Sequence, residues 1–180
     1  VVWGLDETIE IVTRSSMKTF HPGDADAGIR IGTGAWAGFE QRVVGSLSAV
    51  PMCAPALARR IRDWDDLFDQ TLYCAKSRRA ETLESLRHPQ SGNCHPKVVA
   101  FQTLPEAIRA AESGLGVIGG LVPLMNNLVA QGRLRPVLDV QRPLPDEILF
   151  IFAPAHARRL EGVFDWLEDC YRRLPDRADA

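Results

Sequence analysis

The sequence predicts an α/β fold, because short apolar stretches with strand patterns alternate with amphipathic stretches of helical period. This alternation also predicts largely parallel sheets. Hydrophobic residues make up 46% of the chain and charged residues 24%, a composition that can build a sizeable core. A length of 180 residues allows one domain, or two lobes that share a chain.

The central predicted strand lies in residues 24–39, which read DADAGIRIGTGAWAGF. Apolar residues at positions 27, 29 and 31 alternate with Gly28 and Arg30, which predicts a strand with its isoleucine face buried. The stretch 32–34 (GTG) then forms a turn, and Trp36 follows it.

The other elements follow from the same patterns. Pro51 cannot donate to a strand ladder, so its strand should lie at an edge or change partners there. Asp63 can cap the helix that follows it, and residues 103–106 (TLPE) form a capping box at the start of another helix. A proline-rich turn precedes the last strand. The expected strands are 9–12, 47–54, 72–75, 97–102, 115–118, 137–138 and 148–153, and the expected helices 55–61, 63–68, 80–87, 104–111, 121–129 and 160–174.

Composition excludes several classes of protein. The net charge of −2, with arginine pairs scattered among acids, argues against electrostatic binding of nucleic acid by this chain. The four cysteines include no CxxC pair, which favours reduced thiols in the cytoplasm. No apolar run approaches the about 18 residues of a membrane helix. The chain does not begin with methionine, so we expect an upstream part to be missing.

Motifs for catalysis, cofactors and metals are weak. Residues 114–119 match GxGxxG, but they follow a predicted helix and contain a strand, the reverse of the dinucleotide-binding order. Cys94 and His95 would supply at most two of the four ligands that a zinc site needs. We therefore expect no cofactor, no metal and no catalytic residue, although a cysteine nucleophile stays open at this point.

Uncharged polar residues follow two of the predicted strands. Thr13, Ser15 and Ser16 come after the first strand, and Gln102 and Thr103 come after the strand at 97–102. The latter pair opens a helix, whose free amides favour an anionic group. Capping is the first role of Thr103, and the same residue can still line a cleft.

Six motifs in order are similar to those of one family. They are DAGIRIG (26–32, the family's D-x-A-I-R-x-G), GAWAGF (34–39, G-x-W-x-G-L), VPMCAP (50–55, V-P-V-C-S-P), AIRAAESGLGV (107–117, A-L-x-A-A-x-x-G-x-G-V), QGRL (131–134, x-G-R-L) and FDWL (164–167, F-x-x-W-L). On these motifs, residues 9–174 resemble the effector-binding domain of LysR-type transcriptional regulators, in particular the branch that contains the glycine-cleavage activator.

The resemblance implies an α/β fold with two lobes of the type II periplasmic-binding-protein kind and a small effector in the cleft. Lobe one would comprise residues 1–50 and 154–180, and lobe two residues 51–153. The family's first strand and helix of lobe one would be lacking, because Ile9 aligns with the second strand. By position, the effector-binding residues would be Thr13, Arg14, Ser15, Ser16, Trp36, Gln102 and Thr103.

The implied function is that of a regulatory domain, not an enzyme, which senses a small polar or anionic metabolite such as an amino acid or small carboxylate. The full-length protein would be a cytoplasmic homodimer with no membrane association. It would bind DNA through a helix-turn-helix outside this chain. Two alternatives stay open: a free-standing solute-binding protein, and an enzyme on the same scaffold with Cys53 or Cys94 as nucleophile.

Overall fold

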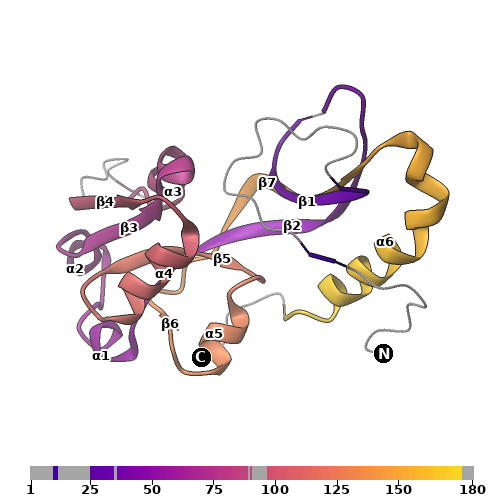
Figure 1. Cartoon of the computed structure of the whole chain (residues 1–180). Coiled ribbons are helices and arrows are strands. Elements are labelled where there is room, and N and C mark those ends of the chain that lie inside the picture. The colour runs from indigo at the N-terminus through magenta and orange to yellow at the C-terminus, as the bar shows by residue number, and fades with distance from the viewer. Residues whose placement is uncertain (1–9, 12–24, 35, 89, 91–96, 176–180) are drawn as a thin grey trace. The chain divides into compact units, whose positions relative to one another are not determined.

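The chain forms two compact units (Figure 1). The structure is a computed structural model that describes residues 10–11, 25–34, 36–88, 90 and 97–175. Unit 1 contains residues 1–47 and 145–174, and unit 2 contains residues 48–144 and 175–180. The chain therefore changes unit at 47/48, 144/145 and 174/175, whereas the lobes expected from the sequence meet at 50/51 and 153/154. The assignment of functional lobes stays a prediction.

Unit 1 is a small sheet with one long helix. Strand β1 (Ala27–Gly32) runs antiparallel to β7 (Arg142–Phe152), with Ala27 opposite Phe152 and Gly32 opposite Glu147. β7 in turn neighbours β2 (Glu40–Cys53). After a 3₁₀ turn, η2 (Pro154–His156), the chain enters α6 (Ala157–Arg172), where a helix was predicted at 160–174.

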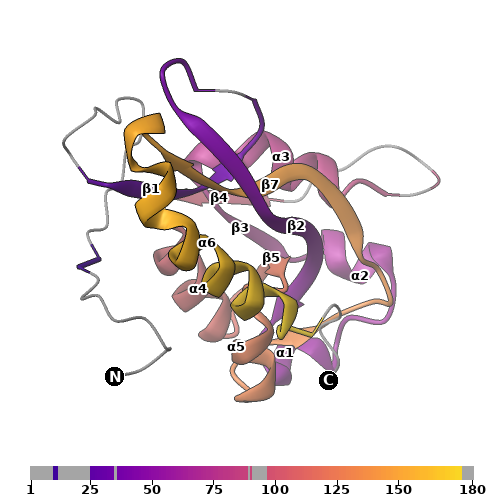
Figure 2. The ribbon, with the colours of Figure 1, turned by 90° about the vertical axis from the view of Figure 1, so that its right-hand side faces the viewer.

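Helix α6 packs against strands of unit 1 (Figure 2). The rings of Phe164 in α6 and Phe150 in β7 lie 6.0 Å apart, centroid to centroid. The Tyr171 hydroxyl donates a hydrogen bond of 2.5 Å to the carbonyl of Ser46 in β2. A Cβ at Gly45 would lie 2.1 Å from Cζ of Tyr171, so the tyrosine ring takes the space that a side chain would need. Glycine at 45 therefore permits this approach of helix and strand.

Unit 2 is built on a mixed sheet in the order β2–β5–β3–β4, with β6 (Arg135–Pro136) also on β2. β3 (Thr71–Ala75) lies parallel to both β4 (Lys97–Phe101) and β5 (Val117–Val122), but β5 runs antiparallel to β2. The prediction of largely parallel sheets is thus correct for β3, β4 and β5 and wrong elsewhere. It failed because it took every neighbouring pair of strands to be joined by a helical crossover.

Start signals are clear for only some of the helices of unit 2. In α2 (Trp64–Phe68) the amide of Asp66 donates to Oδ1 of Asp63 at 2.9 Å, the N-cap predicted from the sequence. The 3₁₀ turn η1 (Lys76–Arg78) leads directly into α3 (Arg79–Ser85). The remaining helices are α1 (Pro55–Ala58), α4 (Leu104–Glu112) and α5 (Asn126–Ala130).

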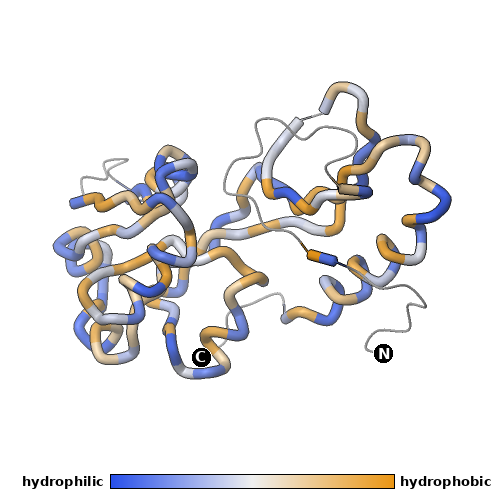
Figure 3. The backbone as a smooth tube through the Cα atoms, viewed as in Figure 1, coloured by the Kyte–Doolittle hydropathy of each residue, from blue (hydrophilic) through white to orange (hydrophobic). Residues whose placement is uncertain are grey.

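The core of unit 2 lies along β5 and β3, whose residues are largely hydrophobic (Figure 3). One cluster joins Cys53, Leu57 and Val117 with apolar side chains of α2 and of the segment after β6. At Gly116, a Cβ would lie 2.3 Å from the carbonyl oxygen of Thr71, so β5 begins where its backbone meets that of β3. The GxGxxG match at 114–119 follows α4 and enters β5, which confirms that its context is inverted.

Several element boundaries differ from those predicted. β5 continues through Gly119 and Gly120 to Val122, where the sequence suggested that the strand ended at the glycines. The strand predicted at 137–138 is displaced to β6, because Leu138 has a φ of 63°, outside the range of strands. The proline-rich stretch belongs to β7 and is not a turn. Its prolines fit there because the pairing of β7 with β1 starts at Glu147, beyond them.

Three further expectations concern single residues or short stretches. Ile29 of β1 is 54% exposed, so the prediction that its face is buried is wrong. Glu10 and Ile11 are the described part of the strand expected at 9–12, and they are not in a strand. Pro51 lies opposite Gly119, and the pairing of β2 with β5 continues through Met52. Met52 and Cys53 also pair with β6, so β2 gains a partner beside the proline and keeps β5 there.

Candidate functional site

The structure describes three of the seven sequence-predicted effector-binding residues, and they lie in two locations. Gln102 and Thr103 lie together in unit 2, between β4 and α4. Trp36 lies in unit 1 after β1. Thr13, Arg14, Ser15 and Ser16 are outside the described residues.

Thr103 forms the predicted capping box with Glu106. The Thr103 amide donates to Oε2 of Glu106 at 2.9 Å. This hydrogen bond is the main cause that lowers the pKa of the Glu106 carboxyl, and a hydrogen bond with the Thr103 side chain is the second. The Glu106 carboxylate therefore occupies the Thr103 amide, which we expected to be available for an anionic ligand. A ligand at this helix start must use the exposed Gln102 side chain and the Thr103 hydroxyl, or displace Glu106.

Trp36 is half-buried, and the side chain of Arg30 lies over its ring. The guanidinium carbon of Arg30 lies 4.1 Å from the ring centroid, a cation–π contact. Nη1 of Arg30 is buried and has no hydrogen-bond partner among the described residues. Trp36 thus has a packing role, and its predicted role in effector binding stays a prediction.

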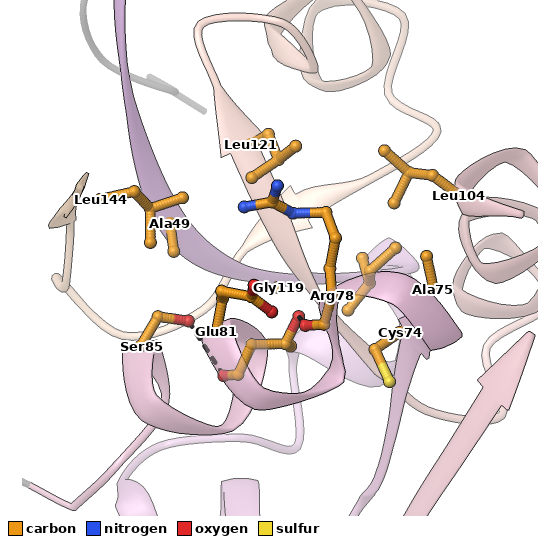
Figure 4. A pocket seen from close by; sticks show the side chains of 12 residues that line it. Ala49, Cys74, Ala75, Arg78, Glu81, Ser85, Leu104, Gly119, Leu121 and Leu144 are labelled. Atoms are coloured by element: carbon orange, nitrogen blue, oxygen red, sulfur yellow. Dashed lines mark hydrogen bonds between the residues drawn. The ribbon is translucent and has the colours of Figure 1, made fainter. Parts of the chain in front are cut away.

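A hollow in unit 2 adjoins the start of α4 (Figure 4). Its volume is about 10 Å³, room for about one water molecule, and Leu104, the first residue of α4, forms part of its wall. All of its lining residues belong to unit 2. They are Ala49, Cys74, Ala75, Arg78, Glu81, Thr82, Ser85, Leu104, Ile118, Gly119, Leu121 and Leu144.

One wall of the hollow is polar and comes from η1 and α3. Arg78, Glu81, Thr82 and Ser85 recur at helical spacing, so they share one face of the helix. Thr82 Oγ1 donates to the carbonyl of Arg78 at 2.7 Å, and Ser85 Oγ donates to the carbonyl of Thr82 at 2.9 Å (Figure 4). The sequence analysis missed these residues. The sequence feature that could have found them is a row of polar residues on one face of a helix that packs against a sheet.

The opposite wall is apolar. Leu121 of β5 and Leu144 of β7 face the hollow together with Leu104. Gly119 lies at its edge, where a Cβ would be 3.0 Å from Cγ2 of Thr82. The absence of a side chain at 119 therefore allows α3 to approach β5 closely enough to form the hollow. The hollow therefore has one polar and one apolar side.

The model of the LysR substrate binding domain matches residues 8–172. The chain belongs to this family. The match takes in every described strand and helix from β1 to α6. The family is one of transcriptional regulators, which agrees with the resemblance found in the sequence motifs.

Relatives of this LysR-type domain include a curated protein and several solved structures. The transcriptional activator AmpR of Rhodobacter capsulatus is 31% identical over 110 residues, which are 61% of this chain and 37% of AmpR. The chain thus spans little more than a third of that relative. The AmpR effector-binding domain of Citrobacter freundii is 24% identical with a TM-score of 0.66, over 82% of this chain and 75% of that one.

A second structure is full-length LysG of Corynebacterium glutamicum with its bound effector Arg. It is 14% identical with a TM-score of 0.61, over 86% of this chain and 54% of LysG. These likenesses confirm the α/β, periplasmic-binding-protein-like, two-lobed fold of LysR effector-binding domains.

The described residues of this LysR-type domain offer little for covalent or metal chemistry. Burial raises the pKa of the Cys53 thiol to about 12, so it stays protonated and is a poor nucleophile. Burial also raises the pKa of Cys74, an effect that Arg79 partly offsets. Cys94 lies outside the described residues. Within the described ranges we find no cluster of three metal-ligating side chains and no helix long and apolar enough to cross a membrane.

Proposed function

We propose that this domain is the effector-binding part of a DNA-binding regulator and that it senses a small polar or anionic metabolite. The observation that carries the proposal is the family match over residues 8–172, which takes in most of both compact units. That match also favours a regulator over a free-standing solute-binding protein.

In this proposal the effector acts by shifting a conformational equilibrium. A ligand that binds one arrangement of the domain more tightly increases the population of that arrangement. Contacts within a homodimer would pass the shift to a helix-turn-helix part of the protein, which binds DNA in the cytoplasm. Activation by AmpR, the curated relative, supports such a role. The six sequence motifs support placement in the branch of the glycine-cleavage activator.

An amino acid or a small carboxylate is the effector that the polar groups suit. Gln102 and Thr103 offer an amide and a hydroxyl at the start of α4. LysG, with which this chain shares its fold, was solved with arginine bound, an example of an amino-acid effector. Thr13, Arg14, Ser15, Ser16 and Trp36 remain proposed contacts.

Thermal unfolding of the chain with a panel of amino acids and small carboxylates tests this function. A ligand at one hundred times its Kd should add about 2.7 kcal/mol to the stability of the folded chain. Thr103→Val should weaken binding of whichever ligand stabilises the chain. Thr103→Ser, which keeps the hydroxyl and the cap, should leave that binding unchanged. A sharp transition that no member of the panel moves would contradict the proposal.

A further inference from the structure

Two neighbouring parallel strands of unit 2 end together at one edge of its sheet. β3 and β4 lie side by side (Figure 1), and their last residues, Ala75 and Phe101, are opposite each other. Lys76 and Ser77 follow β3, and Gln102 follows β4, so these three residues lie on adjacent strand ends. Open α/β sheets bind ligands outside the carboxyl ends of their parallel strands. Groups that meet an effector are therefore expected at this carboxyl edge.

The polar groups at the carboxyl edge are mainly hydrogen-bond donors. The side chains of Lys76, Ser77 and Gln102 are exposed. Within the part of the chain that the structure describes, none of these three side chains makes an ion pair or a hydrogen bond. An ammonium group can only donate, and a hydroxyl and an amide each add donors. Lys76 also begins the stretch 76–79 (KSRR), which has three cations in four residues. Donors and positive charge together suit an anionic oxygen group.

Glu106 makes a cation at this edge necessary for an anionic ligand. Its carboxylate already accepts a hydrogen bond of 2.9 Å from the Thr103 amide. A second carboxylate beside Gln102 would therefore find that amide occupied and would be repelled by the charge of Glu106. The ammonium group of Lys76, on the adjacent strand end, can offset this repulsion.

The amino edge of the same sheet provides an internal comparison. Lys97 is the first residue of β4 and lies opposite Thr71, and it is exposed as Lys76 is. The five residues of β4 separate the two edges by about 16 Å, which is more than the Debye length of about 8 Å at physiological salt. The charge of Lys97 should therefore have little effect at the carboxyl edge.

We propose that Lys76 selects an effector with a free carboxylate. Its ammonium group binds the carboxylate, and Ser77 and Gln102 donate hydrogen bonds to the same oxygens. This inference rests on the proposed function and narrows the effector from any small polar metabolite to one with an anionic group.

The test measures binding of the amino acids and small carboxylates to the whole chain by calorimetry, each beside its amide, which lacks the negative charge. A carboxylate that binds should bind about three- to tenfold more weakly to Lys76→Gln than to the wild type. The difference should shrink in about 0.5 M salt. The amide should bind weakly and equally to both. Lys97→Gln removes the same charge from the other edge and should bind as the wild type does.

A second readout needs no variant. An amine-reactive acetylating reagent, followed by mass spectrometry, should modify Lys76 more slowly when the carboxylate is bound, and Lys97 at an unchanged rate. Equal weakening by Lys76→Gln and Lys97→Gln, or an amide that binds as tightly as its acid, would overturn the inference. Either result leaves the proposed function intact, because a ligand still binds. If no ligand of the panel binds, the proposed function fails and the inference fails with it.

Discussion

Unit 2 buries apolar side chains from strands and from the helices that pack on them, whereas unit 1 places most of its buried side chains on strands. In unit 2, residues of α1, α2 and β5 meet in one cluster. Within α6 of unit 1, all of which the structure describes, only Leu160 is buried. Ile29 and Val43, on the strands of unit 1, are 54% and 47% exposed.

Contacts between cations and aromatic rings occupy part of the helix–sheet interface in unit 1. The guanidinium carbon of Arg42 lies 5.1 Å from the ring centroid of Phe164 and 5.7 Å from that of Phe152. Such contacts contribute about 0.5–1 kcal/mol each at exposed sites, less than a fully buried leucine. Unit 2 is therefore stabilised mainly by apolar area that its strands and helices bury together. Unit 1 depends more on the packing of one helix against its strands. Local hydrogen exchange should therefore be faster in unit 1 than in unit 2.

The largest effect is expected from Gly116→Ala in unit 2. The new methyl group would lie 2.3 Å from the Thr71 carbonyl oxygen, and a backbone atom in a strand cannot move away cheaply. We expect a loss of about 3 kcal/mol or more in the free energy of unfolding, measured by urea titration. Gly120→Ala, which meets the flexible end of Met52, is the control and should cost less. Equal losses of unfolding free energy in Gly116→Ala and Gly120→Ala would show that β5 is not packed tightly against β3.

Gly45→Ala applies the same change to unit 1. Its methyl group would meet the ring of Tyr171, which is at the end of a helix and can rotate away with loss of the bond to Ser46. We expect a cost of about 1–3 kcal/mol, below that of Gly116→Ala, and faster hydrogen exchange in α6. A cost above that of Gly116→Ala would reverse the comparison of the two units.

Thr103→Ala removes a helix cap from unit 2. Loss of an N-cap hydroxyl typically costs about 1 kcal/mol. Faster exchange should be confined to the first turn of α4, because the buried contacts of Ala107 and Ala111 remain. Thr103→Ser should restore the protection. Loss of protection across β3 and β5 as well would contradict a self-contained core in unit 2.

Acid should weaken the same helix start. The pKa of Glu106 is lowered in the folded chain from its ordinary value of 4.5, chiefly by the Thr103 amide. Its contribution to stability is therefore fully present above pH 4.5, and it is lost as the pH falls through the lowered pKa. The exchange of α4 amides, followed by NMR from pH 6 to 3, should show this loss, and Glu106→Gln should remove the dependence.

Local rules predicted those parts of the fold that depend on neighbouring residues. The caps at Asp63 and Thr103 are confirmed, since each requires only residues within one turn. Strand direction was predicted poorly, because β1 and β7 pair across more than a hundred positions and no local pattern records that contact. The exposure of Ile29 was missed for the same reason: a period of two shows which residues share a face, but not whether anything covers it.

The candidate site was predictable only in part. The start of α4 was found from its capping sequence, but the occupation of the Thr103 amide by Glu106 follows from side-chain geometry. Arg78 belongs to one of the scattered arginine pairs that the sequence analysis assigned to no site, and Glu81 was not singled out there. Their position facing the sheet depends on how α3 packs over Gly119, which sequence spacing alone does not fix.

The pairing of β1 with β7 has a consequence for synthesis on the ribosome. Ala27 is opposite Phe152, so 152 − 27 = 125 further residues must be translated before the pair can form. At about 5–20 residues per second, this delay is about 6–25 s. Nearly all of unit 2 emerges in that interval, since its main segment ends at residue 144. Unit 2 is therefore free to fold while unit 1 still waits for its last strand and helix.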